Sequence, residues 1–324
     1  MAPPLIALEE HFDTGLFKSD DLHDNLPPHL TSKLHDIDEG RIKDLDNGKC
    51  NLQVLSHIGS PTPVNECIES NDRLAAACKN RPHRFAGFAN LPMQDHTAAV
   101  KELDRCIKDL DFVGALLNNH IETGEMYDDE RFWPVFQRAV ELDVPIYIHP
   151  TYPADNLVDH YKGNFGFVSG IMMSTAGWGW HSETGLHILR LFAAGLFDRF
   201  PQLKIVIGHM GELIPHMFDR ICHGSRNWSK ADGSKYDRDL RTVWKENIWV
   251  TTSGMFTLPP LKCLLEYSLP EHVMFSVDYP FSSTEMGLEF VEEIERSGIF
   301  TEQQLNDFCY ANAEKLLKVK ISWD

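Results

Sequence analysis

Five residues of the types that bind metals or transfer protons stand at the ends of short apolar runs in this sequence. Glu9 and His11 follow the first run, His149 and His209 end or follow two central runs, and Asp278 follows the last. Side chains two residues apart on an extended segment point the same way, so Glu9 and His11 share a face. A catalytic site of the zinc type needs about three protein ligands and an open position. The five residues therefore predict a metal site with acid–base groups to spare.

These side chains can meet only if the runs before them end at one rim. Eight short apolar runs recur along the chain with the character of buried parallel strands. Most gaps between them carry apolar residues at the three- and four-residue spacing of amphipathic helices. The alternation predicts an α/β protein, a (β/α)8 TIM barrel, in which sites lie at the carboxyl ends of the strands. The runs span 5–8, 52–58, 84–90, 112–117, 145–149, 204–208, 248–253 and 272–277, and the helical patterns span 65–80, 97–110, 130–142, 183–200, 290–297 and 301–319.

An open doubly wound sheet is the alternative fold, because it also alternates strands and helices. No glycine-rich GxGxxG turn follows the first strand, although the dinucleotide-binding sheets of that class carry one there. We therefore expect residues 1–324 to form a single barrel domain. Two stretches interrupt the repeat: a polar helical insertion over about 13–48, after the first strand, and a stretch rich in glycine and aromatics over about 150–181, after the fifth.

Composition excludes several classes of partner. The chain has 30 basic and 48 acidic residues, a formal net charge of −18, which argues against nucleic acid and anionic membrane surfaces. Seven scattered cysteines without a CxxC motif are typical of reduced thiols. No apolar run approaches the roughly 18 residues of a membrane span, and the N-terminus lacks a basic leader region. We expect a cytoplasmic protein whose site supplies its own positive charge to any anionic substrate.

Each metal-type residue has a plainer interpretation when taken alone. A histidine at a strand end is more often a hydrogen-bonding or capping residue, and an aspartate before Tyr-Pro can cap a turn. The coincidence at four strand ends favours the metal site. His83, His96 and His272 lie at opposite ends of elements or in turns and are interpreted as structural, while the sequence leaves His181 and His187 open.

Several segments together resemble one family. ALEEHF, IYIHP, GHMGE, VTTSG and FSVDYPF are similar to the decarboxylase branch of the amidohydrolase superfamily. This branch contains the o-hydroxybenzoate decarboxylases, which act on 2,3-dihydroxybenzoate, γ-resorcylate or salicylate, and the aminocarboxymuconate-semialdehyde decarboxylases. The resemblance runs nearly end to end. It implies a barrel that decarboxylates a small aromatic carboxylate with one divalent metal ion (Zn, Mn or Mg), as a homodimer or homotetramer.

The resemblance also implies roles for single residues. His209 matches the catalytic histidine, with Glu212 as its partner in a catalytic dyad, and Asp278 matches a ligand that also serves as the acid. Arg220 matches an arginine that in some relatives reaches the site of the neighbouring subunit. Phe281 matches an aromatic that packs on the substrate ring. The four implied metal ligands are Glu9, His11, His149 and Asp278.

Two features narrow the resemblance. The wider superfamily carries HxH on the first strand, whereas Glu9 and His11 form ExH here, which is typical of the hydroxybenzoate enzymes and points away from the semialdehyde branch. The fourth strand, in FVGALLNN, ends without a lysine, so we expect no binuclear site bridged by a carboxylated lysine. 2,3-Dihydroxybenzoate is the first expected substrate, with salicylate and γ-resorcylate next. The further residues expected to shape its pocket are Phe12, His57, Trp178, Trp180 and Asn118 or Asn119.

Direct loss of CO2 from an aromatic ring would leave an aryl carbanion, so we expect the ring carbon to be protonated first. Asp278 is the expected acid, kept partly protonated by a low-dielectric pocket. One alternative is a metal-dependent hydrolase of a lactone or amide, with Asp278 as the base. Glu9 argues against a hydrolase, because a carboxylate ligand in place of the usual histidine adds negative charge to the site and makes the metal less able to acidify bound water. The other alternative is a non-catalytic barrel with a closed structural metal site.

Overall fold

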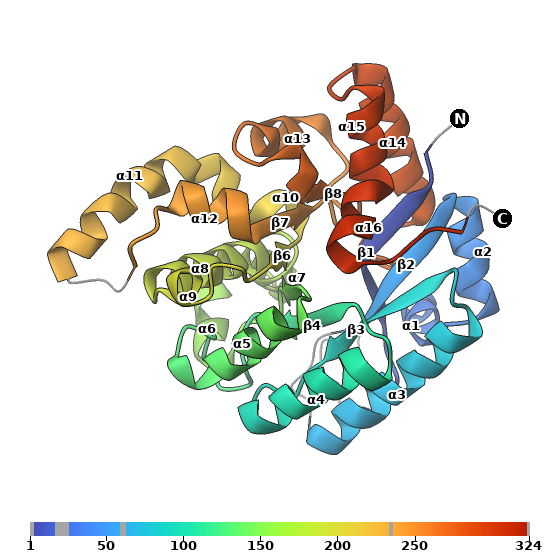
Figure 1. The fold of residues 1–324 in the computed structure, drawn as a ribbon, viewed down its shortest axis with the longest axis horizontal. Coiled ribbons are helices and arrows are strands. Elements are labelled where there is room, and N and C mark those ends of the chain that lie inside the picture. Colours follow the sequence, from blue (N-terminus) through green and yellow to red (C-terminus); the bar gives the residue numbers. More distant parts are fainter. Residues whose placement is uncertain (1–2, 17–25, 59–62, 233–235, 323–324) are drawn as a thin grey trace.

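Eight parallel strands form one closed sheet. The computed structural model describes residues 3–16, 26–58, 63–232 and 236–322. The strands follow one another in the order β1 to β8, and the ring closes where the backbone N–H of His11 donates to the carbonyl of Tyr279, at 2.7 Å. The predicted (β/α)8 barrel is confirmed (Figure 1). The strands are β1 (Leu5–Phe12), β2 (Cys50–His57), β3 (Phe85–Asn90), β4 (Gly114–Asn118), β5 (Ile146–His149), β6 (Ile205–Ile207), β7 (Ile248–Thr251) and β8 (Val273–Met274).

Helices surround the sheet and alternate with its strands (Figure 1). The α-helices are α1 (Pro28–His35), α2 (Glu39–Asn47), α3 (Val64–Asn80), α4 (His96–Asp109), α5 (Trp133–Leu142), α6 (Asp155–Val158), α7 (Phe167–Ser174), α8 (Gly179–Ala193), α9 (Leu196–Arg199), α10 (His209–Glu212), α11 (Ile214–Asp232), α12 (Leu240–Asn247), α13 (Leu258–Leu265), α14 (Thr284–Ser297), α15 (Glu302–Asn306) and α16 (Asn312–Leu317). Short 3-10 turns are η1 (Glu130–Phe132), η2 (Asp159–Tyr161) and η3 (Pro270–His272), and η4 (Asp307–Ala311) is a π-helical turn.

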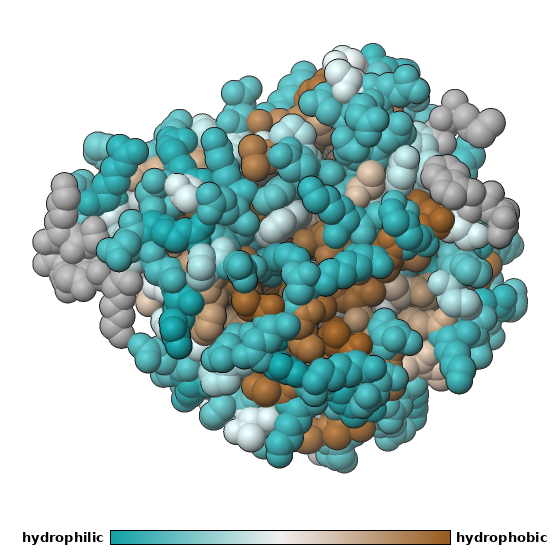
Figure 2. Space-filling model, viewed as in Figure 1, coloured by the Kyte–Doolittle hydropathy of each residue, from teal (hydrophilic) through white to brown (hydrophobic). Residues whose placement is uncertain are grey.

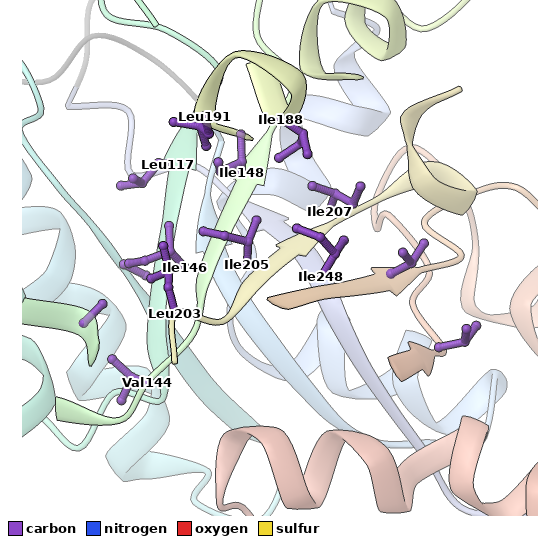
Figure 3. Close-up of a cluster of buried hydrophobic side chains, with 14 of the residues drawn as sticks. Leu117, Val144, Ile146, Ile148, Ile188, Leu191, Leu203, Ile205, Ile207 and Ile248 are labelled. Atoms are coloured by element: carbon purple, nitrogen blue, oxygen red, sulfur yellow. The ribbon is translucent and has the colours of Figure 1, made fainter. Parts of the chain in front are cut away.

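Side chains on the two faces of the sheet pack into separate apolar layers. On β5, Ile146 and Ile148 pack outward with Ile188 of α8 (Figure 3), whereas Tyr147 belongs to the cluster inside the barrel. Because side chains alternate along a strand, His149 points to the same side as Tyr147. The alternation that builds the core thus also aims a polar side chain into the mouth of the barrel.

The helical predictions differ from the structure at two places. The pattern over 183–200 continues through Gly195, but this residue adopts a left-handed φ of +84° and separates α8 from α9. The closing pattern over 301–319 contains α15, the π-helical turn η4 and α16 rather than one helix. In both regions the apolar spacing survives the break, so periodicity alone does not reveal it.

The two predicted insertions contain helices of their own. The stretch 13–48 holds α1 and α2, and α2 packs against β2 and α14; its residues 17–25 lie outside the described part of the chain. The stretch 150–181 holds α6, η2, α7 and the start of α8. The face of the molecule in Figure 2 is mostly hydrophilic, with apolar residues gathered near its centre. Among the described residues, no helix is long and apolar enough to cross a membrane.

His187, which the sequence left open, is a buried structural residue. Its Nε2 accepts a hydrogen bond from the backbone N–H of Tyr127 at 3.0 Å, and its Nδ1 donates to Oδ1 of Asn119 at 3.0 Å. This pattern requires a neutral ring. Burial lowers the pKa of His187 to about 3, and the charge of Arg190 adds to the effect.

The low pKa of His187 predicts a specific pH dependence of stability. Between its ordinary pKa of 6.5 and about 3, the unfolded chain binds a proton here that the native chain excludes. The free energy of unfolding therefore falls as the pH falls through this window, by up to about 1.4 kcal/mol per pH unit from this group. Urea unfolding at pH 4 to 7 should show a shallower slope for His187→Gln than for the wild type. His83→Gln, at an exposed position, is the control, and an unchanged slope in His187→Gln would refute the assignment.

Candidate metal centre

Four predicted ligands converge at one rim of the barrel. The donor atoms of Glu9, His11, His149 and Asp278 all lie within 4.8 Å of one another. Nε2 of His149 is 3.2 Å from Oε1 of Glu9, and Nε2 of His11 is 3.2 Å from Oδ1 of Asp278. Glu9 and His11 are completely buried, while the side chain of Asp278 is 18% exposed. The strand ends therefore bring together the set that the sequence predicted.

A β-bulge turns the ligands of β1 toward the barrel interior. Ile6 and Leu8 belong to the inner apolar cluster, so simple alternation would point Glu9 outward. The pairing with β2 shifts between Ala7 and Glu10, and the N–H groups of both Leu8 and Glu9 donate to Oγ of Ser276. One extra residue in a strand reverses which side chains face inward. The bulge therefore aims Glu9, and His11 after it, into the site.

The two oxygens of Glu9 have different surroundings. Oε2 accepts hydrogen bonds from the hydroxyl of Tyr147 and from Oγ of Ser253, the latter at 2.6 Å. Oε1 has no hydrogen-bond partner in the described part of the chain, and neither does Nε2 of His11, 3.9 Å away. Buried polar atoms without partners are rare, and a cation between these two would satisfy both. The residues present therefore fit a divalent metal.

The protonation states also fit a metal. Burial would raise the pKa of Glu9, but the charge of His209 and the contacts of His149 outweigh it, so the pKa lies well below its ordinary value. Burial lowers the pKa of His11, although the nearby carboxylate of Asp278 opposes the effect. Glu9 is thus held ionised and His11 neutral, the forms in which these side chains bind metals.

Asp278 follows β8 with a left-handed φ of +66°. Its neighbours are held by the fully buried Glu10, whose carboxylate accepts from the backbone N–H of Val277 at 2.9 Å and of Tyr279 at 3.4 Å. Burial raises the pKa of Glu10 to about 8, against the opposing effect of the Val277 hydrogen bond. The sequence did not predict a role for Glu10.

The expectation that a low-dielectric pocket keeps Asp278 partly protonated is corrected by the structure. Burial does raise the pKa of Asp278, but the neighbouring imidazoles of His11 and His209 outweigh it, and the pKa lies below its ordinary value. In His209 the balance has the opposite outcome. Burial lowers its pKa, yet the carboxylates of Glu212 and Glu9 hold the pKa well above its ordinary value. The surroundings thus favour the protonated form of His209 and the ionised form of Asp278.

His209 lies beside the four ligands. Its Nδ1 donates to Oε1 of Glu212 at 2.7 Å, and its Nε2 is 3.5 Å from Oε1 of Glu9 and 3.9 Å from Oδ2 of Asp278. Glu212 is fully buried; burial would raise its pKa, but His209 and a second histidine, His181, lower it. The predicted pairing of His209 with Glu212 is present in the structure, with His209 directed between two carboxylates.

The residues predicted to shape the pocket divide into two groups. The ring of Phe281 is 39% exposed and its centroid lies 5.9 Å from that of His11. Trp178 is exposed at the start of α8, and Trp180 packs edge-on against Tyr152. Of these aromatic side chains, Phe281 lies beside one of the predicted ligands.

The structure places Phe12 and His57 elsewhere. Phe12 is buried in the outer apolar layer, with its ring edge-on to His57. Nε2 of His57 accepts from the backbone N–H of Thr14 at 3.0 Å, and Nδ1 donates to the carbonyl of Ile58 at 2.7 Å. Both ring nitrogens are thus used within the chain, which favours a structural role over the predicted substrate contact. Arg220 is exposed on α11, and its predicted reach into a neighbouring site requires a second copy of the chain.

Comparisons with known proteins agree with this site. The family model described as Amidohydrolase matches residues 64–319. Decarboxylase orsB of Emericella nidulans is 47% identical to the chain, over 98% of each. The γ-resorcylate decarboxylase of a Polaromonas species is 35% identical, over 97% of this chain and 98% of its own.

A solved structure adds the chemistry of bound groups. The dihydroxybenzoic acid decarboxylase of a Polaromonas species contains manganese and the inhibitor 2-nitroresorcinol. It is 32% identical, with a TM-score of 0.87, over 98% of this chain and 97% of its own. A metal and an aromatic ligand thus occur together in a protein similar to this chain over nearly its whole length.

The hydroxyl groups behind Glu9 predict the effect of a substitution. Tyr147→Phe removes one of the two donors to Oε2 and leaves the carboxylate held by Ser253 alone, so the affinity for Mn²⁺ should weaken by about ten-fold or more. Competition of the metal-free protein with a fluorescent chelator measures this. Tyr267→Phe is the matched control, because it removes a tyrosine hydroxyl bonded to the surface carboxylate of Asp219 and should leave the affinity unchanged. Equal affinities for Tyr147→Phe and the wild type would contradict the role of this hydroxyl.

Proposed function

This chain belongs to the amidohydrolase family and is a carboxy-lyase that uses a divalent metal on a hydroxybenzoate-type substrate, and from this premise we propose that it releases CO2 from a 2,6-dihydroxybenzoate-type acid. The observation that carries the proposal is the convergence of the four predicted ligands, with His209 directed between Glu9 and Asp278. The alternatives of a hydrolase and of a non-catalytic barrel are set aside, because two relatives similar over nearly the whole chain are named as decarboxylases.

The order of candidate substrates changes with the comparisons. The sequence placed 2,3-dihydroxybenzoate first. γ-Resorcylate, named for the Polaromonas relative, is 2,6-dihydroxybenzoate, and 2-nitroresorcinol carries the same two hydroxyls beside a nitro group. We therefore place 2,6-dihydroxybenzoate ahead of 2,3-dihydroxybenzoate and salicylate. Manganese, present in the similar structure, is for the same reason the first metal among Mn, Zn and Mg.

Glu9, His11, His149 and Asp278 would hold the metal. When bound, it would supply the positive charge that attracts an anionic acid to a chain of net charge −18 and that neutralises the carboxylate beside the ortho hydroxyl. Phe281, close to His11 and partly exposed, would pack against the substrate ring and keep it over the site.

The proton required by the reaction starts on His209 in this proposal. Its Nε2 faces Oδ2 of Asp278, at 3.9 Å, so Asp278 can take the proton and deliver it to the ring carbon that bears the carboxylate. The bond from that carbon to the carboxylate then breaks, and its electron pair restores the aromatic ring as CO2 leaves. One proton is consumed in each turnover. Glu212 acts through His209, whose ring it orients.

A panel of aromatic acids tests the substrate. CO2 release by the manganese-loaded protein should be fastest from 2,6-dihydroxybenzoate, slower from 2,3-dihydroxybenzoate and salicylate, and undetectable from 3-hydroxybenzoate, which has no ortho hydroxyl. Faster turnover of 2,3-dihydroxybenzoate than of the 2,6 isomer would restore the sequence-based order. Release from none of the ortho-hydroxy acids would refute the proposal.

A substitution at Asp278 tests the acid. Asp278→Asn keeps an oxygen that can bind the metal but cannot deliver a proton, so the rate should fall by about 10²- to 10⁴-fold. Metal analysis should still find nearly one ion per chain. A rate within about two-fold of the wild type would contradict the role of Asp278.

We propose further that the chain forms a homodimer or homotetramer through the apolar surface of segment 158–186. Exposed apolar patches of this kind mark interaction sites, and the exposed Arg220 can reach the site of another subunit only in such an assembly. Most large exposed apolar side chains of the described residues fall in this segment. They are Val158, Phe165, Phe167, Val168, Met172, Met173, Trp178 and Leu186.

A charge placed on this surface should disrupt the assembly. Phe167→Asp should shift the molar mass from light scattering toward that of one chain, because Phe167 is 79% exposed in the single chain and would become buried only at an interface. Met286→Asp, at a half-exposed position of α14, should leave the mass unchanged. A monomeric wild type would refute the assembly without bearing on the decarboxylase activity.

A further inference from the structure

Glu212 holds two histidines at once. Its Oε1 accepts from Nδ1 of His209 and its Oε2 accepts from Nδ1 of His181, each at 2.7 Å. The Glu212 side chain is completely buried, whereas that of His181 is 14% exposed. Without His181, one oxygen of a buried carboxylate would lose its hydrogen bond, and the carboxylate could rotate away from His209.

The backbone that carries this pair needs support from outside. Left-handed φ values are disfavoured for residues other than glycine, and a run of them persists only where the surroundings fix it. Helix α8 supplies such a contact, because a Cβ on Gly185 would lie 2.5 Å from the carbonyl oxygen of Glu212. His181, one turn earlier on α8, supplies a second contact to the same residue. The run comprises His209, Met210, Gly211, Glu212 and Leu213, with φ of 49°, 56°, 92°, 52° and 64°.

The other side of His181 contacts the turn between α7 and α8. Its Nε2 donates to the carbonyl of Ala176 at 3.0 Å, in the stretch 150–181 that follows β5. His181 is therefore the link between this stretch and the buried pair of His209 and Glu212, and its ring centroid lies only 4.5 Å from that of His209.

We propose that His181 is a positioning residue for decarboxylation, which holds Glu212 in the orientation that aims His209 at the substrate. The proposal rests on the proposed function of His209. Two imidazoles and a carboxylate are also a donor set that zinc accepts, and their donor atoms lie close together. Both oxygens of Glu212 are already satisfied by N–H donors, however, which favours the positioning role over a second metal site.

Three substitutions separate the two contacts of His181. His181→Ala removes both. His181→Asn reaches as far as Nδ1 and keeps an N–H for Glu212, whereas His181→Gln reaches as far as Nε2 and keeps one for Ala176. His160→Ala is the matched control, because His160 is an exposed histidine of the same stretch that packs on Tyr161. Steady-state kinetics of the manganese-loaded proteins, metal analysis and thermal melting are measured for each, on the fastest acid of the panel.

The expected result is a split between kcat and KM. His181→Ala and His181→Gln should lose about 10- to 100-fold in kcat, with KM within about three-fold of the wild type and one metal per chain. His181→Asn should recover most of kcat, and His160→Ala should match the wild type. A merely structural residue would lower the melting temperature in all three variants without this rescue pattern.

Three outcomes would overturn the inference: wild-type kcat in His181→Ala, equal losses in the Asn and Gln variants, or a second metal ion that disappears with His181. His209→Asn separates this failure from that of the proposed function. If His209→Asn retains the wild-type rate, the proposed role of His209 fails. If it loses the rate while all His181 variants keep theirs, only the role of His181 fails.

Discussion

The carboxylate of Glu9 is the constraint around which the site is built. A fully buried anion is unfavourable unless it is hydrogen bonded or paired with a cation. The barrel meets half of this requirement, since hydroxyl groups from β5 and from the end of β7 bind Oε2, and it leaves Oε1 facing His149, His209 and the other ligands. The interior of the barrel is therefore incomplete as a purely structural core. A bound cation best explains why Oε1 of Glu9 has no hydrogen-bond partner. The negative charge of Glu9 also favours the placement of His149 and His209 close to this oxygen.

Much of this architecture is predictable because the sequence shows two patterns, the short apolar runs of buried strands and the three- and four-residue apolar spacing of amphipathic helices. Apolar runs alternating with amphipathic helices specify the barrel, and the ends of its strands must share a rim, so the ligand set follows. The alternation of side chains along a strand also explains why Phe12 does not line the substrate pocket, contrary to the prediction from the sequence. Phe12 directly follows His11, and neighbours on a strand point to opposite faces, so one cannot line the site beside the other. The structural role that the structure favours for His57 could not be foreseen for another reason, because its partners Thr14 and Ile58 depend on how two loops meet.

The supporting groups could not be predicted from the sequence. Tyr147 and Ser253 approach Glu9 from positions 138 and 244 residues away in sequence. Both lie in segments that carry the family resemblance, IYIHP and VTTSG, but neither segment indicates that its hydroxyl binds Glu9. His181 lies at the end of the stretch 150–181, where the sequence shows no helical period although the structure places it in the first turn of α8. It reaches Glu212 across 31 residues. Residues that bind a metal carry a signal in their type and position, whereas the residues that orient them are specified only by packing.

The bulge in β1 divides that strand into two parts with different registers. The first part packs the barrel core, and the second presents ligands to the site. Before the bulge, Ile6 and Leu8 fill the barrel; after it, Glu9 and His11 face the site. Substitutions before the bulge can exchange one apolar shape for another without turning the ligands. An insertion or deletion of a single residue there acts differently, since it would present Glu10 and Phe12 to the site and turn both ligands away. Point substitutions before the bulge can therefore change the packing of the barrel core step by step and leave the metal ligands in place. A change in the length of this segment would instead remove both ligands from the metal centre at once.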